Sequence, residues 1–374
     1  MRIERIELRL VRLPLVRFFE TSLGRIDDRA FVLVTVEEDG AVGVGECVAD
    51  ERPFYSSETT RTAWHLLADF LGPMVLGRTF THPGDLFDAL SPVRGHHMAK
   101  AAIEMAAWDL FARQQNRRLA EVLGGAPATI ANGIASGVSI GIQESLDALV
   151  SRVEAELAEG YQRIKIKIKP GWDLEPVRVL RGLFGDIPLM VDANAAYSLT
   201  DARHIAALDP FDLMMIEQPL EYDDLGDHAT LQKQLRTAIC LDESLETPRR
   251  AEEALTRGAC RIINIKPGRV GGHAQSIRMH DIAVACGAPV WHGGMLESGI
   301  GRAHNIHLST LPGFTLPGDV AASRRYFAPD VIDPEIVVRP DGTIAVPTGP
   351  GIGVHIVEDR VARASVERLE LRYH

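Results

Sequence analysis

The chain has 374 residues, 46% hydrophobic and 24% charged, which are ordinary globular values and enough for a large core in about two domains. A net charge of −11 and a pI near 5.6 argue against nucleic acid or an anionic membrane as a partner, since both attract clustered positive charge. No apolar run is long enough to span a membrane, and the amino terminus alternates charged and apolar residues unlike a signal peptide, so we expect a cytoplasmic protein.

The amino-terminal part, residues 1–127, has a mixed character. Alternating apolar residues predict strands over 3–15 and 30–37, and apolar residues spaced three or four apart predict a helix over 97–115. We therefore expect an α+β capping domain here. After about residue 328 the chain is rich in proline and glycine, and we expect residues 328–374 to pack back on this cap.

Residues 128–327 alternate short apolar runs with amphipathic stretches, which predicts a parallel sheet. A repeat of about 25 residues suits one strand, one helix and two loops, and eight such strands favour closure into a (β/α)7β barrel of the TIM type. An open doubly wound sheet is the alternative, but its ligand site uses the ends of only a few strands. The strands should end near Ser139, Lys167, Asp192, Glu217, Asp242, Lys266 and His292, with a poorer eighth strand at 314–316.

Five of these strand ends carry a charge where a buried strand normally carries Val, Ile or Leu. Lys167, Asp192, Glu217, Asp242 and Lys266 follow one another at intervals of 25, 25, 25 and 24 residues. We call these five residues the charged ladder. Because barrel enzymes gather their catalytic groups at the carboxyl ends of the strands, the ladder predicts one site of three carboxylates between two lysines.

The three carboxylates of the ladder are hard oxygen ligands on neighbouring strands. Such a set suits Mg²⁺, which completes its octahedron with water and substrate oxygens, whereas zinc prefers His or Cys. Three acids that simply pair with buried basic groups are the alternative, because unpaired buried carboxylates are rare.

The lysines of the ladder predict acid/base chemistry. Lys165 and Lys167 lie two apart on one strand and share a face, so each ammonium should lower the pKa of the other towards the range of a base. Lys266 should lie across the barrel, where it could act on the opposite face of a bound molecule. A metal beside lysine bases suits removal of the weakly acidic proton next to a carboxylate, because Mg²⁺ stabilises the resulting enolate. Lys169 precedes Pro170-Gly171 and is expected in a loop.

Other polar features receive simpler interpretations. The segment GRVGGH at 268–273 lacks the GxGxxG order of a nucleotide site and is expected to be a turn between strand and helix. His304 and His307 share a helical face without further ligands, which favours a helix surface or interface over a metal site. Glu243 should orient a lysine or a loop. The scattered cysteines predict free, mostly buried thiols.

Several motifs give the chain a resemblance to a known family. The likeness is carried between residues 163 and 319 by RIKIKIKPGWD, VDANAAY, IEQPL, CLDES, NIKPGRVGG, WHGGMLESGIGRAHN and LPGD. These motifs resemble the N-succinylamino acid racemase / o-succinylbenzoate synthase family, in the muconate lactonizing subgroup of the enolase superfamily. The segments TSLG, YSSE and HHMAKAAIEMAAWD extend the resemblance to nearly the whole chain.

The resemblance implies a role for each residue of the site. Mg²⁺, for which Mn²⁺ can substitute, would be bound by Asp192, Glu217 and Asp242. The acid/base pair would be Lys167 and Lys266, supported by Lys165. The substrate site would include Ser139, Asn194, Gly293, Gly294, Met295, Tyr55 and Asp319. Loops of the cap at 21–24 and 52–57 would close over the barrel mouth. Relatives often carry a small residue at position 292, so His292 would alter substrate preference if it faced the pocket.

The family's chemistry begins with removal of an α-proton from a small-molecule carboxylate. It continues as a syn dehydration that makes o-succinylbenzoate for menaquinone synthesis, or as racemization of N-succinylamino and other N-acylamino acids. One site can support both, because the first half-reaction is shared. Relatives commonly assemble, so a homo-oligomer between a dimer and an octamer is expected.

Three other functions are compatible with a barrel of this kind. Dipeptide epimerases and muconate cycloisomerases use the same ladder, but dipeptide epimerases typically show a DxD pair on the eighth strand. Here Asp319 is followed by Val320 and Ala321, so that pair is absent. A non-catalytic binding barrel would have lost bases or ligands, whereas all six of the predicted acids and lysines are present.

Overall fold

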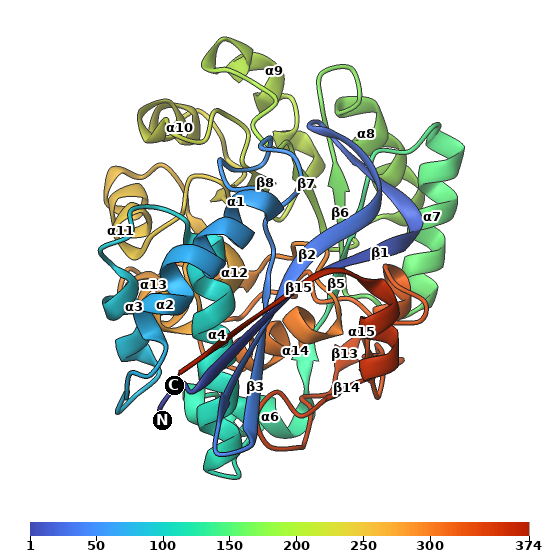
Figure 1. The fold of residues 1–374 in the computed structure, drawn as a ribbon. Coiled ribbons are helices and arrows are strands. Elements are labelled where there is room, and N and C mark those ends of the chain that lie inside the picture. Colours follow the sequence, from blue (N-terminus) through green and yellow to red (C-terminus); the bar gives the residue numbers. More distant parts are fainter. Residues whose placement is uncertain (374) are drawn as a thin grey trace.

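The computed structural model describes residues 1–373 and places an antiparallel sheet against a barrel (Figure 1). The antiparallel sheet has the order β15-β1-β2-β3, with β1 at Arg5–Thr21, β2 at Gly24–Glu38, β3 at Ala41–Cys47 and β15 at Ser365–Arg372. The carboxyl-terminal strand β15 pairs antiparallel with β1, which brings the two ends of the chain side by side.

Helices of the amino-terminal part follow β3 in the chain, and the longest of them packs on this sheet. They are α1 (Thr60–Leu66), the π-helix η1 (Leu67–Leu71), α2 (Gly72–Val75), α3 (Gly84–Leu90), α4 (His97–Gln114), α5 (Leu119–Leu123) and α6 (Pro127–Asn132). The buried helix α4 packs directly on β3, where glycines allow a close approach. A Cβ added at Gly45 would lie 2.1 Å from the carbonyl oxygen of Ala102. The predicted helix over 97–115 is confirmed.

The barrel contains seven parallel strands in chain order. They are β5 (Gly137–Ile140), β6 (Arg163–Lys167), β7 (Leu189–Asp192), β8 (Ile216–Glu217), β9 (Ile239–Leu241), β10 (Ile262–Ile265) and β11 (Val290–His292). The segment 314–318 closes the ring, because Phe314 forms a parallel bridge with Val290 and Gly318 forms one with Ser136. The predicted barrel and its poorer eighth strand are therefore confirmed.

Helices follow the barrel strands and lie outside them (Figure 1). They are α7 (Leu146–Ala158), α8 (Leu174–Phe184), η2 (Leu199–Asp201), α9 (Ala202–Ala206), η3 (Asp209–Phe211), α10 (Leu225–Gln232), α11 (Pro248–Arg257), α12 (Pro267–Val270), α13 (His273–Ala285) and α14 (Gly299–Leu308). The carboxyl-terminal part adds η4 (Ser323–Arg325) and α15 (Glu358–Ala364). It also forms two short antiparallel pairs, β4 (Ile134–Ala135) with β13 (Thr343–Ile344) and β12 (Ile332–Asp333) with β14 (His355–Ile356). The boundaries 127/128 and 327/328 stay predictions.

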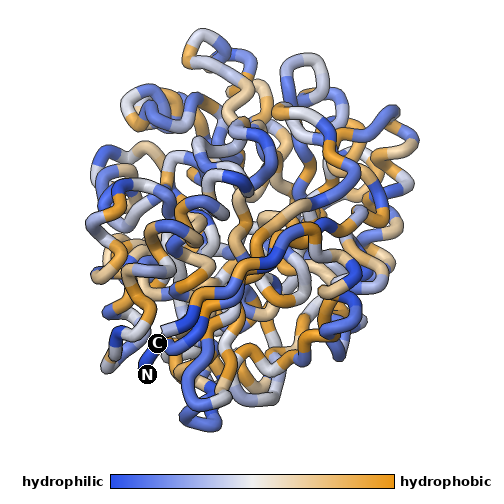
Figure 2. Tube along the Cα trace, viewed as in Figure 1, coloured by the Kyte–Doolittle hydropathy of each residue, from blue (hydrophilic) through white to orange (hydrophobic). Residues whose placement is uncertain are grey.

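Two apolar layers surround the barrel wall. Outward-facing side chains of the barrel strands pack under the helices. In the antiparallel strands of the cap, hydrophobic and hydrophilic residues alternate along the chain (Figure 2). The inside of the barrel is filled by a small cluster of Met190, Met215, Cys240, Ile262 and Trp291. This cluster closes the barrel below the charged residues, so the site lies at the carboxyl ends of the strands.

No helix among residues 1–373 combines the length and apolarity that crossing a bilayer requires. The cysteines are free, as predicted, and Cys286 is the exposed one.

Candidate active site

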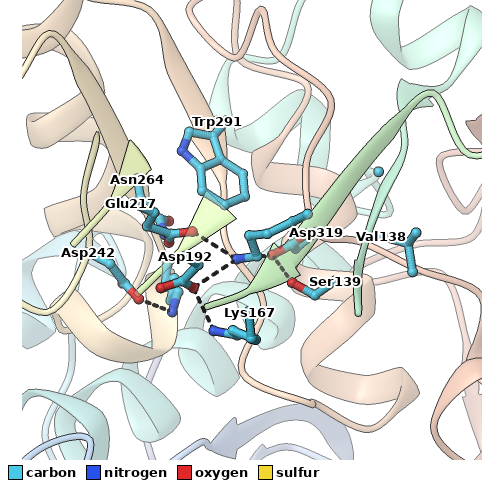
Figure 3. A network of polar contacts seen from close by, with 12 residues as sticks. Val138, Ser139, Lys167, Asp192, Glu217, Asp242, Asn264, Trp291 and Asp319 are labelled. Carbon is cyan, nitrogen blue, oxygen red and sulfur yellow. Dashed lines mark hydrogen bonds and ion pairs between the residues drawn. The ribbon is translucent and has the colours of Figure 1, made fainter. Parts of the chain in front are cut away.

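The ladder residues meet at one end of the barrel. The parallel register pairs Lys167 with Asp192 and Asp192 with Glu217, so these three side chains lie in one row across β6, β7 and β8. Asp242 follows β9 directly and Lys266 follows β10. Figure 3 shows Asp192 and Glu217 between Asp242 on one side and Asp319 with Ser139 on the other.

Each acid of the ladder contacts a buried cation. Lys167 Nζ lies 2.5 Å from Asp192 Oδ2, and Lys266 Nζ lies 2.6 Å from Asp242 Oδ2. Glu217 accepts a hydrogen bond from Lys165 Nζ at 3.0 Å through Oε2 and one from Asn264 Nδ2 at 2.7 Å through Oε1. The protein chain alone therefore shows the arrangement that the alternative predicted, in which each buried acid pairs with a basic group.

Lys165 is the most heavily paired of the lysines. Its Nζ lies 2.5 Å from Asp319 Oδ2, 3.0 Å from Glu217 Oε2 and 3.5 Å from Asp192 Oδ2, and it lies over the ring of Trp291. Burial favours the neutral amine, but these three negative charges raise the pKa of Lys165 well above its ordinary value. The prediction that neighbouring ammonium groups lower this pKa is wrong for Lys165, because the carboxylates outnumber the cations around it.

The acids repel one another strongly enough to suit a divalent cation. Burial and then the negative charge of Asp192 raise the pKa of Glu217 to about 7, and Asp242 adds to the same effect. Among residues 1–373 no three His, Cys, Asp or Glu side chains are arranged as a metal site, because each ladder acid faces a lysine instead. Three adjacent, mutually repelling carboxylates nevertheless have the donor chemistry that Mg²⁺ prefers, so the residues fit this ion.

Asn194 and Glu243 form a second layer beside the ladder. Asn194 Oδ1 accepts a hydrogen bond from Lys167 Nζ at 2.8 Å, and its Nδ2 donates one to Glu243 Oε1 at 2.8 Å. Asn194 holds a left-handed φ of +43°, a conformation that Asn tolerates better than most residues. Glu243 thus orients Asn194, which in turn orients Lys167. Burial and the charges of Asp242 and Asp192 raise the pKa of Glu243 to about 8.

The lysines open into a cavity of about 510 Å³, a volume typical of small-molecule sites. Lys167 and Lys266 line its inner end together with Asn194, and the cap provides its outer walls and rim. The cap also reaches the ladder directly, because Tyr55 donates a hydrogen bond to Asp242 Oδ1 at 3.0 Å and accepts one from Lys266 Nζ at 3.1 Å. A smaller cavity of about 50 Å³ reaches Ser139 and Asp319.

The loop after β11 places its residues close to Lys266. Met295 Sδ lies 3.5 Å from Lys266 Nζ. A Cβ at Gly293 would lie 2.5 Å from Lys266 Cε, and a Cβ at Gly294 would lie 2.9 Å from the carbonyl oxygen of Asp319. Only glycine therefore fits at these two positions without moving the lysine or the eighth strand.

Comparisons with known proteins agree with this geometry. Residues 5–124 match the mandelate racemase / muconate lactonizing enzyme N-terminal domain, and residues 148–360 match the enolase C-terminal domain-like family. The chain belongs to the enolase superfamily. An o-succinylbenzoate synthase of Geobacillus kaustophilus is 49% identical, over 96% of this chain and 95% of that protein. An N-succinylamino acid racemase of Thermus thermophilus is 48% identical, over 98% of both chains.

A solved structure extends the comparison to three dimensions. An enolase superfamily protein from Listeria innocua superposes with a TM-score of 0.95 and 38% identity, covering 100% of this chain and 99% of that one. The predicted resemblance to the family of o-succinylbenzoate synthases and N-succinylamino acid racemases is confirmed by these relatives.

Not every predicted residue of this enolase superfamily site lines a cavity. The three ladder acids and Gly293 lie behind the lining, whereas the cavities are lined by Tyr55, Ser139, Lys165, Lys167, Asn194, Lys266, Gly294, Met295 and Asp319. His292 faces the outer side of β11, where its ring stacks on Phe314 with centroids 6.1 Å apart. Burial lowers the pKa of His292 to about 4. An effect of His292 through direct substrate contact is therefore not supported.

The sequence interpretation missed four residues that contact the ladder, Lys165 or Asp319. Arg163 donates to Asp319 Oδ1 at 2.6 Å, Arg269 donates to Asp242 Oδ1, and the other two are Asn264 and Trp291. Strand alternation could have found two of them, because Arg163 lies two residues before Lys165 and Asn264 two before Lys266. Arg269 lies in the short helix α12, which no pattern predicted.

His304 and His307 are confirmed as interface residues. Both are buried on α14, where His304 lies 2.9 Å from a ring nitrogen of His273 and 2.7 Å from the carbonyl oxygen of Val44 in the cap. Lys169 is 41% exposed and lies 3.3 Å from Glu20, as expected of a loop lysine.

Proposed function

We propose that this enolase superfamily protein is a Mg²⁺-dependent enzyme that removes the α-proton of a small carboxylate. We propose two products from the same site, o-succinylbenzoate by syn dehydration and racemized N-succinylamino or other N-acylamino acids. The observation that carries the proposal is the placement of two buried lysines, Lys167 at the end of β6 and Lys266 directly after β10, in one cavity beside three acids.

The two lysines approach a bound molecule from different sides. Three strands separate β6 from β10 in the ring, so Lys167 and Lys266 stand across the barrel from each other. Asn194 fixes the Nζ of Lys167, while Tyr55 and Met295 surround that of Lys266. Mg²⁺ held by Asp192, Glu217 and Asp242 would supply positive charge next to the substrate carboxylate and so favour loss of the α-proton.

The roles of the lysines differ between the two reactions. In racemization, one lysine removes the α-proton and the other returns a proton to the opposite face, so each serves one enantiomer as base. In dehydration, Lys167 removes the proton and then protonates the leaving hydroxyl, and Lys266 stabilises the negative charge as an ammonium. Lys165 remains positive throughout, because Asp319 and Glu217 hold it.

Deuterium exchange tests the shared first step. The protein with Mg²⁺ in D₂O should introduce deuterium at the α-carbon of both enantiomers of N-succinylphenylalanine, measured by proton NMR. Absence of exchange with both enantiomers would contradict racemase chemistry. Formation of o-succinylbenzoate from its hydroxy acid precursor is measured separately by absorbance, and comparing the kcat/KM values identifies the preferred reaction.

We further propose a setting for this activity. The protein acts in the cytoplasm, its dehydration serves menaquinone synthesis, and it assembles as a homo-oligomer. Light scattering in solution measures the assembly, and deletion of the gene followed by quinone analysis tests the pathway.

A further inference from the structure

The rim of the cavity carries four arginines, and three of them are neutralised by acids of the same rim or its edge. Arg12 pairs with Asp28 and Glu51, and Arg29 pairs with Asp50. Arg25 lies 3.4 Å from Asp27 and 3.9 Å from Glu144. Within residues 1–373, Arg52 is the one rim arginine with no carboxylate within 4.0 Å.

Arg52 is held at the rim by its neighbours in the cap. Its Nη2 donates a hydrogen bond to the carbonyl oxygen of Arg25 at 3.1 Å, and its guanidinium lies 5.3 Å from the ring centroid of Phe54. Three residues later, Tyr55 is anchored to Asp242 and Lys266. The loop therefore starts at the rim with an unneutralised cation and ends at the reactive end of the cavity.

Apolar side chains also line the cavity that holds the two lysines and Arg52. They are Phe19, Ile26, Phe54, Met295 and Leu296. One cavity therefore combines lysines backed by acids, apolar walls and an unneutralised guanidinium. A ligand that matches these three features has an anionic reactive end, a short apolar linker and a second anion.

We propose that Arg52 binds the remote carboxylate of the substrate and so selects N-succinyl over uncharged N-acyl groups. This inference rests on the proposed function, since the reactive carboxylate must lie at the lysine end. A guanidinium is suited to carboxylates because its planar donors match the two oxygens. Because Arg52 is exposed, its contribution should be modest, about fivefold in affinity.

A binding experiment separates the charge of Arg52 from its contact with Arg25. Titration calorimetry with Mg²⁺ present gives the Kd of N-succinyl-L-phenylalanine and of N-acetyl-L-phenylalanine for the wild type, Arg52→Gln and Arg52→Lys. Glutamine retains a donor for the carbonyl oxygen but no charge. We expect Arg52→Gln to lose about fivefold affinity for the succinyl ligand only, and Arg52→Lys to keep most of it.

Arg25→Gln is the matched control. Arg25 lines the same cavity, but its charge is already neutralised, and the variant keeps the carbonyl group that accepts from Arg52. This variant should leave the succinyl-to-acetyl ratio of Kd unchanged. Raising NaCl to 0.5 M should raise this ratio in the wild type, because salt weakens binding of the succinyl carboxylate, and should leave it unchanged in Arg52→Gln.

The outcomes separate the two proposals. An equal loss for both ligands in Arg52→Gln, or no succinyl preference in the wild type, overturns the role of Arg52. Absence of α-deuterium exchange in the wild type refutes the proposed chemistry instead, and the ratio of Kd values still decides whether Arg52 recognises the second carboxylate.

Discussion

On the floor of the cavity, formed by the charged ladder and Lys165, every charged side chain is at most 9% exposed and contacts a buried partner. On the rim, formed by the cap, Arg12, Arg25 and Asp27 are 43%, 45% and 71% exposed. Charges on the floor interact in a low dielectric and hold fixed positions, whereas the exposed charges on the rim, unlike the buried Arg29, are screened by water and salt.

This difference divides the work of the site between the two domains. The buried floor defines a step that allows little variation, removal of an α-proton. The exposed rim meets the part of the substrate that does not react, where substitutions cost little stability. Variants of the floor should therefore abolish chemistry or weaken the fold, and variants of the rim should change only which substrate is preferred.

The largest effect is expected from removing one base of the floor. Lys266→Ala should lower α-proton exchange about 10³-fold or more for the enantiomer that Lys266 serves, because a positioned general base contributes about 10²–10⁴. Slow exchange should remain for the other enantiomer, which Lys167 still faces. Lys167→Ala should show the reverse pattern by proton NMR in D₂O. Equal residual exchange of both enantiomers in either variant would rule out bases on opposite faces.

The second effect compares a buried with an exposed lysine from the same strand end. Lys165→Met should lower the free energy of unfolding by about 3–5 kcal/mol, because it removes the cation between Asp319, Glu217 and Asp192. Lys169→Met is the matched control and should cost less than about 1 kcal/mol, since Lys169 is 41% exposed. Urea titrations followed by circular dichroism measure both. Similar losses in the two variants would show that burial does not distinguish these lysines.

A third experiment moves a floor lysine without removing it. Gly293→Ala places a Cβ about where Lys266 Cε and Asn264 already lie, so it should lower kcat about 100-fold while the fold is retained. Gly182→Ala in α8 is the control, because nothing lies within 4 Å of its added Cβ. The control should keep full activity and gain about 0.5–1 kcal/mol in stability. An active Gly293→Ala enzyme would mean that the loop moves aside easily.

The same contrast explains what the sequence could predict. The ladder was visible because each barrel strand is local and places its last residue at one known edge, so Lys167, Asp192, Glu217, Asp242 and Lys266 could be grouped without a structure. The rim could not be predicted in this way, because it consists of cap loops that come together only after folding. The hydrogen bond from Arg52 to the carbonyl oxygen of Arg25 is an example. The raised pKa of Lys165 was missed for a similar reason, since Asp319 reaches it from the far end of the barrel sequence.

A buried acid at the joint between cap and barrel is expected to give the smallest effect. Glu46 of β3 accepts hydrogen bonds from Ser298 N at 3.1 Å, Ser298 Oγ at 2.5 Å and Gly301 N at 3.1 Å, at the start of α14 and directly after the loop that carries Met295. Glu46→Gln should cost about 1–3 kcal/mol, because one buried donor loses its acceptor. Glu104→Gln is the matched variant, because Glu104 also accepts hydrogen bonds from backbone amides at the start of a helix, in this case α13.

The pH dependence of this cost tests how the carboxyl of Glu46 is stabilised. Burial raises the pKa of Glu46 from 4.5 to about 7. The folded state then holds the proton more tightly than the unfolded state, so the contribution of Glu46 is complete below pH 4.5 and is lost as the pH rises through about 7. The stability difference between wild type and Glu46→Gln, from urea titrations at pH 5 and pH 8, should therefore shrink as the pH rises. A difference that grows instead would mean that the helix start and its amide donors stabilise the carboxylate more than burial destabilises it, and the cap would then be joined to the barrel by an anion.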